Sequence, residues 1–275
     1  MCVPGCQEAI HQALSRDALS RRRVFAAAAG FAATAVAPSP GVAAPRPGRR
    51  VIDLTHTMSV DIPTFDGTPG IAMMRLKELK RDGYNLYEWR LNEHSGTHLD
   101  APLHFSDTGI STDQIPAETL VVPLAVINVA DKAATNPDYR LSRDDLAAWE
   151  RRHGRLPDNA CVAMHSGWAR HIVDTAKYVG QDAGGVMHFP GIDPDATAWL
   201  IKQRKIAGLA VDTLSLDPGN SKDFRTHVLW LGSGRWGLEN VANLDSVPAN
   251  GATLVVGLAK VKGATGGPAR LFALA

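Results

Sequence analysis

Hydrophobic residues are grouped along this chain in short runs, each about the length of a buried β-strand. The runs cover residues 51–54, 121–129, 160–165, 206–211 and 253–261. In one further segment the apolar residues Tyr87, Trp89 and Leu91 alternate with Glu88 and Arg90. This period of two predicts another strand, with one polar face.

Helices are predicted between these runs. Ser142 is a favourable N-cap residue with Asp145 three positions later, so a helix is expected to begin there. Residues 195–205 form a second helical segment, whereas the Pro- and Gly-containing segments 63–70 and 190–194 are expected to be loops or turns. Strands and helices alternate too unevenly for a (β/α)8 barrel. The pattern favours a single α/β domain with a mixed sheet.

Residues 1–44 resemble a secretion signal. The pair Arg22 and Arg23, with the hydrophobic residues after it, is similar to a twin-arginine export signal. The weakly apolar segment 25–37 has the length of a signal-peptide core and is too short to span a bilayer. We therefore expect residues 45–275 to be the mature domain, located in the periplasm without a membrane anchor. The alternative is a helical N-terminal arm that stays on the protein.

Composition places the chain among soluble globular proteins. Of its 275 residues 45% are apolar and 21% are charged, which excludes a fully disordered chain. Lys and Arg total 29 against 28 Asp and Glu, so the net charge is +1 and no basic excess indicates a nucleic-acid partner. Three Cys cannot form a four-Cys zinc site. Cys2 and Cys6 would leave with the signal, and Cys161 is expected to be a buried core thiol.

Candidate metal ligands are concentrated in residues 94–104, which read HSGTHLDAPLH. His94, His98, Asp100 and His104 supply imidazole and carboxylate groups, which suit zinc, manganese or iron. A glycine and a proline within the segment argue against a continuous helix. Three protein ligands would leave positions open for water, which is typical of a catalytic site, whereas a fourth ligand would make the metal purely structural.

The same segment resembles a known family, the metal-dependent cyclases, which include bacterial kynurenine formamidases and isatin hydrolases. Residues 94–104 match the family pattern HxGTHxDxPxH at every fixed position. Residues 53–59, 188–200 and 208–217 are similar to other family segments, so the resemblance covers about residues 50–262. It implies the swivelling β/β/α fold of that family, and a homodimer or larger homo-oligomer.

The resemblance also assigns roles to individual residues. One metal ion would be bound by His94, His98 and Asp100, and a second would be held by His227 and Glu239. Asp100 would bridge two divalent ions, zinc or manganese, and His104 would transfer protons. Glu239 makes the chain similar to the two-metal formamidases, because the isatin-hydrolysing relatives carry Gln at this position.

These roles imply a metal-dependent amidohydrolase, in which a metal-bound hydroxide attacks a carbonyl and His104 passes a proton to the leaving nitrogen. The expected reaction is arylformamidase activity on an N-formyl aryl amine such as N-formylkynurenine, as in tryptophan catabolism. The first alternative is hydrolytic opening of a cyclic amide or lactone, as with isatin. The second is a non-catalytic periplasmic binding protein. No G-x-S-x-G segment supports a serine hydrolase.

Further residues are assigned to the pocket and its support. Phe65 and Trp168 are candidates for an aromatic substrate wall, and His188 is a candidate for the pocket lining. Asp212 and Ser215 follow a buried strand and are expected to orient a ligand histidine.

Two loops bear on the function. Residues 232–237, GSGRWG, fit G-x-G-x-x-G but lie too late in the chain for a dinucleotide fingerprint, and a flexible loop that delivers Glu239 is expected there. Residues 65–69 read FDGTP where formylkynurenine-hydrolysing members tend to have Trp-Pro-Gly-Asp-Pro, which leaves the substrate open. Export also fits poorly with tryptophan catabolism, which is normally cytoplasmic.

Overall fold

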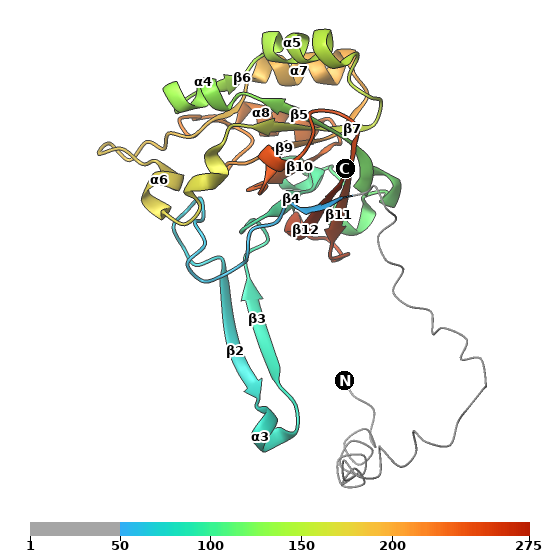
Figure 1. The fold of residues 1–275 in the computed structure, drawn as a ribbon. Helices are drawn as coiled ribbons and strands as arrows, with labels where there is room; N and C mark the ends of the chain where they lie inside the picture. The colour runs from blue at the N-terminus through green and yellow to red at the C-terminus, as the bar shows by residue number, and fades with distance from the viewer. Residues whose placement is uncertain (1–49) are drawn as a thin grey trace, which may run out of the picture. The chain divides into compact units, whose positions relative to one another are not determined.

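One large β-sheet organises residues 50–275, the part of the chain that the computed structural model describes (Figure 1). The sheet has eight strands in the order β1-β12-β11-β5-β7-β9-β10-β4, and β12 also pairs with β4, so that the sheet closes into a barrel. Its strands are β1 (Val51–Asp53), β4 (His98–Asp100), β5 (Val121–Asn128), β7 (Ala160–His165), β9 (Ile206–Val211), β10 (Trp236–Glu239), β11 (Ala252–Leu258) and β12 (Gly266–Leu274). The predicted signal segment, residues 1–44, lies outside the described residues.

Three helices, α5, α7 and α8, pack against the outer face of this sheet, and Figure 1 shows α5 and α7 side by side above it. The helices are α3 (Leu79–Asp82), α4 (Ala130–Thr135), α5 (Arg143–His153), α6 (Thr175–Val179), α7 (Pro194–Gln203) and α8 (Arg225–Gly232). Within residues 50–275, no helix has both the length and the apolar character needed to span a bilayer.

The sheet is mixed, as the sequence predicts. Strands β5, β7, β9 and β10 are parallel neighbours, while β1, β4, β11 and β12 join through antiparallel pairings. The predicted strands at 51–54, 160–165 and 206–211 are confirmed almost to the residue. The prediction of one α/β domain is also confirmed, because the strands and helices of the described chain form one compact unit.

Two hydrophobic layers account for the unbroken apolar runs of the parallel strands. Alternate residues of β5, such as Leu124 and Val126, pack inside the barrel against Cys161. The residues between them, Ala125 and Ile127, pack outward against the helices. Because both faces of the strand are covered, neither face needs polar residues. Cys161 is fully buried, as predicted.

A polar cluster fixes the start of α5. Ser142 is the N-cap and forms the predicted capping box with Asp145. The carboxylate of Asp145 accepts hydrogen bonds from the Ser142 backbone N–H at 2.8 Å and from the Tyr139 hydroxyl at 2.7 Å, and it pairs with the Lys132 ammonium. Asp145 is only 6% exposed, so this cluster joins the end of α4 to α5 with little access to water.

Two short strands form an arm that projects away from the barrel in Figure 1. Strands β2 (Ile71–Lys77) and β3 (Leu86–Leu91) pair only with each other within the described chain, and the short helix α3 connects them. The predicted strand at 87–91 is confirmed, but every residue of β3 is exposed, so neither of its faces is covered.

Two segments predicted to be loops, residues 190–194 and 232–237, contain strand residues in the structure. Gly191–Ile192 form the short strand β8, which pairs with β6 (Arg140–Leu141), and α7 then begins at Pro194. Residues 236–237 already belong to strand β10, so Glu239 is delivered by a strand and the prediction of a flexible loop is wrong. The parallel pairing of β10 with β9 orders this segment.

Candidate metal centre

Three elements bring the five predicted metal ligands together. Strands β4 and β10 are antiparallel neighbours, and their register places His98 directly opposite Glu239. Asp100 lies at the end of β4, His94 precedes this strand, and His227 comes from the first turn of α8.

The side-chain atoms of these residues face a common centre. His98 Nε2 lies 3.2 Å from Asp100 Oδ1 and 3.4 Å from Glu239 Oε2. His227 Nε2 lies 3.0 Å from Glu239 Oε1 and 3.5 Å from Asp100 Oδ2. His94 Nδ1 lies 2.7 Å from Asp100 Oδ1. Except for His94, these side chains are almost completely buried.

Glycine at two positions permits this close approach. Gly96 has a φ of +61°, in the left-handed region that favours glycine, and its carbonyl accepts a hydrogen bond from His98 Nδ1 at 2.9 Å. Gly266 begins β12, where an added Cβ would lie 2.5 Å from His94 Cε1. A larger residue at Gly266 would therefore displace the imidazole of His94.

Hydrogen bonds fix the ring orientation of two histidines. His98 Nδ1 donates to the Gly96 carbonyl, and His227 Nδ1 donates to Asp217 Oδ2 at 2.7 Å. In each ring this leaves the Nε2 lone pair directed at the centre, the arrangement typical of metal-bound histidines. Asp217 also accepts the backbone N–H groups of Thr226 and His227, so it positions the start of α8 as well.

Sequence analysis missed Asp217 and assigned its role to two neighbours. Ser215 does not contact His227 but supports Asp217, because its hydroxyl accepts a hydrogen bond from the Asp217 backbone N–H at 3.2 Å. Asp212 instead accepts hydrogen bonds from the backbone and hydroxyl of Ser166 and from the backbone N–H of Trp168. The Asp212 carboxylate therefore holds the loop after β7 rather than a ligand histidine.

Two unpartnered polar atoms indicate that these residues fit a metal. His98 Nε2 and Asp100 Oδ2 are buried and have no hydrogen-bond partner within residues 50–275. Leaving such atoms unpaired costs about 1–3 kcal/mol each, and a divalent cation would satisfy both. Nitrogen and oxygen donors of this kind are the ligands that zinc and manganese accept.

Two groups of potential ligands share Asp100. One group comprises His98, Asp100 and Glu239, and the other comprises His94, Asp100 and His104, each with ligand atoms within 4.8 Å of one another. This division differs from the predicted one, which gave His94 and His98 to the same ion and kept His104 free. Asp100 belongs to both groups, and its bridging role stays a prediction.

Electrostatics of the centre are dominated by its buried carboxylates. Burial opposes ionisation of Asp100, but the facing imidazoles hold its pKa well below the usual range. Burial would lower the pKa of His98, yet Asp100 and Glu239 raise it to about 9. The pKa of His227 is likewise raised well above its usual value, against the effect of burial, by Asp100, Asp217 and Glu239. A divalent cation would take the place of these protons.

His104 differs from the other histidines of the centre. Burial lowers its pKa to about 4, with further lowering by the neighbouring imidazoles and opposition from Asp100. Its ring is stacked on that of His94, with 3.7 Å between the ring centroids. The imidazole of His104 is therefore uncharged at neutral pH, and one of its ring nitrogens keeps its lone pair.

A cavity of about 320 Å³ opens over the centre. Three phenylalanines form part of its wall: Phe65, Phe105 and Phe224. Phe105 stacks on His227 with 4.7 Å between centroids, and Phe224 lies 5.9 Å from Phe105. Phe224 has a φ of +47°, an uncommon conformation for a bulky residue, which holds its ring over the cavity at the start of α8. Sequence analysis identified Phe65 but neither of the other two.

Comparison with known proteins shows the family of the chain. The family model described as "Putative cyclase" matches residues 52–218. The chain belongs to the cyclase family. It is 33% identical over 242 residues to the isatin hydrolase of Roseibium aggregatum, a match that covers 82% of this chain and 91% of that protein. It is 26% identical over 222 residues to the kynurenine formamidase of Salinibacter ruber, covering 80% and 95%.

Solved structures of the cyclase family share the fold. Isatin hydrolase A from Ralstonia solanacearum superposes with a TM-score of 0.78 at 33% identity, covering 88% of this chain and 99% of that chain. Isatin hydrolase A from Labrenzia aggregata, bound to benzyl benzoate, gives a TM-score of 0.77 at 35% identity, covering 82% and 93%. The predicted cyclase fold with a mixed sheet is therefore confirmed.

Two residues assigned to the pocket lie elsewhere in this cyclase-family structure. Trp168 packs beside Tyr178, and its indole N–H donates to the Tyr178 carbonyl at 2.8 Å. His188 Nδ1 bonds to Asp138 at 2.8 Å, and its Nε2 lies 3.4 Å from Asp182. Neither Trp168 nor His188 lines the 320 Å³ cavity.

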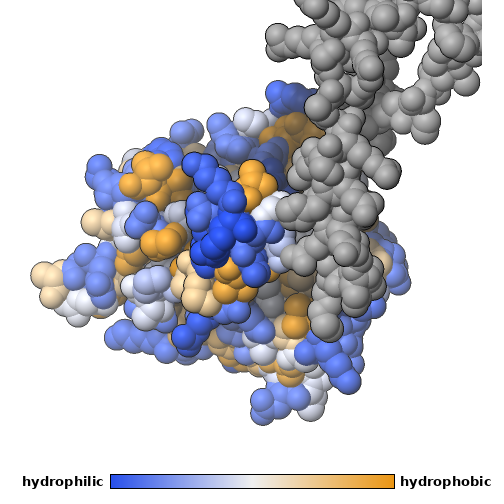
Figure 2. Space-filling model, turned by 90° about the horizontal axis from the view of Figure 1, so that it is seen from below, coloured by the Kyte–Doolittle hydropathy of each residue, from blue (hydrophilic) through white to orange (hydrophobic). Residues whose placement is uncertain are grey.

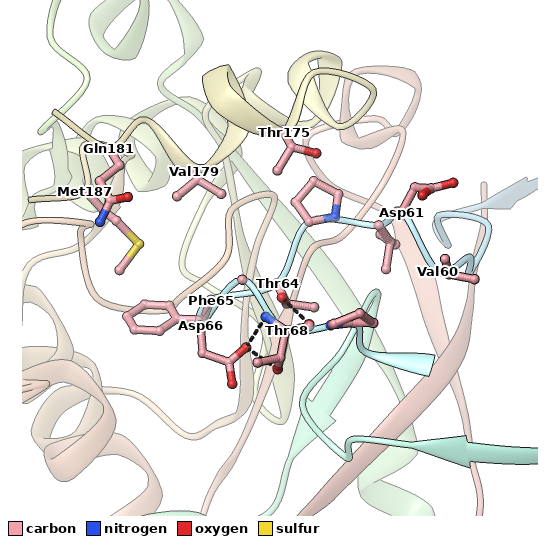
Figure 3. Close-up of a pocket in the computed structure, with 14 residues that line it drawn as sticks. Val60, Asp61, Thr64, Phe65, Asp66, Thr68, Thr175, Val179, Gln181 and Met187 are labelled. Atoms are coloured by element: carbon pink, nitrogen blue, oxygen red, sulfur yellow. Dashed lines mark hydrogen bonds between the residues drawn. The ribbon is translucent and has the colours of Figure 1, made fainter. Parts of the chain in front are cut away.

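A groove beside the cavity shares the loop that carries Phe65. Figure 3 shows residues 60–69 on one side of this groove, with Val179 and Met187 on the other. The Asp66 carboxylate accepts hydrogen bonds from Thr68, which tighten the loop. Phe65 thus borders both hollows.

Proposed function

We propose that this protein is a metal-dependent hydrolase that cleaves the C–N bond of an amide carried by an aromatic ring. The proposal depends on one observation: five side chains of the types that bind metals meet beneath a cavity lined by aromatic rings. Two atoms of this cluster, His98 Nε2 and Asp100 Oδ2, have no hydrogen-bond partner among the described residues. The relatives named isatin hydrolase and kynurenine formamidase support this reaction class.

The proposed metal ligands are side chains that reach the centre: His94, His98, Asp100, His227 and Glu239. We propose zinc or manganese, and a pair of ions, because these five side chains exceed the three protein ligands that one catalytic ion needs. When bound, a divalent ion polarises a carbonyl group and lowers the pKa of water toward neutrality.

His104 is proposed to move the proton during amide cleavage. Its ring borders the cavity and makes no hydrogen bond to another group of residues 50–275, so its nitrogens are available to the substrate. It would accept a proton at a ring nitrogen and return it to the leaving nitrogen of the amide. Stacking on His94 holds the ring in place for both transfers.

The cavity wall favours a compact, neutral aromatic substrate. The three phenylalanine rings would contact an aromatic ring over their faces and edges. Among the described residues that line the cavity, none is Lys or Arg. The carboxylate of an amino-acid substrate would therefore lack a charged partner there. A cyclic amide such as isatin fits these properties best.

An N-formyl aryl amine is the second candidate, and Glu239 favours it. The Glu239 carboxylate is 5% exposed and lies between His98 and His227, where it would be a full ligand to a second ion. The resemblance noted above associates Glu at this position with the formamidases.

The deciding experiment measures hydrolysis of isatin and of N-formylkynurenine by the purified chain. Each assay is run as isolated, after chelation, and after zinc or manganese is restored. Chelator-sensitive opening of isatin would support the leading substrate class, and preferential turnover of N-formylkynurenine would support the second. No turnover of either by metal-loaded protein would overturn both substrates.

We also propose that residues 1–44 direct export to the periplasm by the twin-arginine route, as the Arg22-Arg23 pair and the apolar segment after it support. The double substitution Arg22→Lys/Arg23→Lys should retain the protein in the cytoplasm, as measured by cell fractionation. Arg16→Lys is the matched control and should leave export unchanged. Equal export of the double variant would rule out this route.

A further inference from the structure

The junction between the arm and the barrel carries one of the proposed metal ligands. Figure 2 looks from below, the side toward which the arm points, and shows hydrophobic patches among hydrophilic ones on this face. Strand β3 ends at Leu91, and residues 92–97, which belong to no helix or strand, lead from there to β4. Because His94 lies in this segment, its ring is held by side-chain contacts and not by a strand ladder.

A short chain of hydrogen bonds ends at the ring of His94. The Thr265 hydroxyl lies 2.6 Å from Glu93 Oε2 and 2.9 Å from His94 Nε2. Glu93 Oε2 also accepts the Thr265 backbone N–H at 2.9 Å. Thr265 directly precedes β12, the strand that closes the barrel, so these bonds connect the junction to the closing strand.

The direction of each bond follows from the protons that are available. A carboxylate oxygen only accepts hydrogen bonds, and a threonine hydroxyl has a single proton to donate. Thr265 therefore donates its proton to Glu93, the partner at the shorter distance. Toward His94 the same hydroxyl oxygen can only accept, so Nε2 of His94 carries a proton.

The other ring nitrogen of His94 faces the centre. Nδ1 lies 2.7 Å from Asp100 Oδ1. In a neutral ring that is protonated at Nε2, Nδ1 has a lone pair. A lone pair and a carboxylate oxygen at this distance repel each other, and a divalent cation bound to both atoms would remove the repulsion.

The contacts of the ring also exclude the flipped orientation. Turning the ring over would replace Nδ1 and Nε2 by carbon atoms, so the bonds to Asp100 and Thr265 would both be lost. The His104 ring, stacked at 3.7 Å between centroids, restricts the space around the imidazole. The backbone at Gly266 does so as well, since a Cβ there would lie 2.5 Å from His94 Cε1.

We propose that Thr265 and Glu93 are positioning residues, which hold His94 so that Nδ1 binds the metal. This inference rests on the proposed metal-dependent function. The Glu93 carboxylate, acting through the Thr265 hydroxyl, stabilises the proton on Nε2 and so keeps the lone pair on Nδ1.

His94 is then reversed relative to two other proposed ligands. His98 and His227 each donate a hydrogen bond through Nδ1 and present Nε2 to the centre. His94 donates through Nε2 and presents Nδ1. Loss of the Thr265 hydroxyl would remove the bond that selects this nitrogen.

Matched threonine substitutions test the positioning role. Thr265→Val keeps the size of the side chain but removes the hydroxyl, whereas Thr265→Ser keeps the hydroxyl. Zinc affinity, measured by titration against a fluorescent chelator, should fall about 10–100-fold in Thr265→Val. Thr265→Ser should stay near the affinity of the parent chain.

Thr112→Val is the matched control. The Thr112 hydroxyl donates to the Val261 carbonyl at 2.8 Å, so it anchors the same segment before β12 through a different bond. Zinc affinity should be unchanged in this variant. An equal loss in Thr112→Val and Thr265→Val would overturn the proposal, because it would show that the segment only needs to be anchored.

Glu93→Gln tests the contribution of the negative charge. The amide can still accept a hydrogen bond from Thr265, but it cannot stabilise the proton on His94 Nε2 as a carboxylate does. Zinc affinity should therefore fall, though by less than in Thr265→Val. Glu88→Gln, exposed on β3, is the control and should bind zinc like the parent chain. Unchanged affinity in Glu93→Gln would overturn the role of Glu93.

Nuclear magnetic resonance identifies the ring nitrogen directly. In zinc-loaded protein that is isotope-labelled at histidine, long-range proton–nitrogen correlation spectra distinguish protonated from metal-bound ring nitrogens. His94 should carry its proton on Nε2, whereas His98 and His227 should carry theirs on Nδ1. A proton on Nδ1 of His94 would overturn the proposal, and this measurement on the parent chain decides the question even if Thr265→Val does not fold.

These measurements need no substrate, so they separate the positioning role from the proposed function. Zinc binding without hydrolysis of any aryl amide would overturn the proposed function alone. Full zinc affinity in folded Thr265→Val, or an equal loss in Thr265→Ser, would overturn the positioning role alone. A parent chain that binds no zinc would overturn both. Circular dichroism verifies that each variant is folded.

Discussion

Asp217 determines how a neighbouring imidazole can act. By accepting the Nδ1 proton of His227, it leaves Nε2 of the same ring free for a metal. The residue types and spacing of the motif predict the ligands themselves, because imidazole and carboxylate groups at those positions have few other uses. They do not predict Asp217, since its partner depends on how the loop after β9 turns back toward α8.

Asp217→Asn should therefore weaken metal binding at the centre by about 10–100-fold. The amide cannot supply the negative charge that orients and polarises the His227 ring. Metal affinity measured by competition with a chromophoric chelator checks this. Asp107→Asn, at an exposed position, is the control. Unchanged affinity in Asp217→Asn would mean that His227 needs no such support.

His104→Gln separates proton transfer from metal binding. If His104 only moves protons, kcat should fall by about 10²–10⁴-fold, while the metal content of the purified protein stays the same. Loss of one metal equivalent would instead identify His104 as a ligand, as its grouping with His94 and Asp100 permits. His153→Gln, on the exposed end of α5, should change neither quantity.

Elements with a strong local signal are the ones that sequence predicts well. Strand β7 is a continuous apolar run, and α5 begins with a capping box, so local residues suffice to define them. In contrast, β12 opens with Gly-Gly-Pro, and α8 is preceded by polar residues and by Phe224 at positive φ. These elements form because neighbouring strands and Asp217 hold them, which a local pattern does not show.

Asp145→Asn should destabilise the start of α5 in a pH-dependent way. Burial opposes ionisation of Asp145, but Lys132, Ser142 and Tyr139 lower its pKa below the usual value. The charged form therefore stabilises the fold above the unfolded pKa, about 3.9 for Asp, and this contribution is lost as the pH falls through the lower folded value.

Urea unfolding at a series of pH values measures this effect. The variant should lose about 1–3 kcal/mol at pH 7, and its difference from the parent chain should shrink below about pH 4. Asp144→Asn, exposed in the same helical turn, should cost less at pH 7. A difference that does not depend on pH would show that the carboxylate charge is unimportant.

At the scale of the molecule, the centre is assembled from distant parts of a closed barrel. Local reasoning predicts a mixed sheet, but not its closure, which depends on β12 pairing with β4. His94 bonds through Nε2 to the Thr265 hydroxyl at 2.9 Å, just before β12. Metal binding in this position should therefore stabilise the whole fold.

Removing the metal should lower the melting temperature as well as abolish hydrolysis. Ligand at 100 times its Kd stabilises the bound state by about 2.7 kcal/mol, which corresponds to roughly 5 °C or more for a domain of this size. Thermal unfolding with chelator, and again after zinc or manganese is restored, checks this. An unchanged melting temperature in protein shown to be metal-free would mean that the candidate metal centre is equally stable without its ion.

The bond between His94 and Thr265 also has a consequence for biosynthesis. Its partners are 171 positions apart, which a ribosome covers in roughly 10–30 s at about 5–20 residues per second. Throughout that interval the histidine motif has been translated while β12, whose pairing with β4 closes the barrel, has not. Any ion captured then is held by an open chain, so discrimination among metals begins only once the barrel has closed.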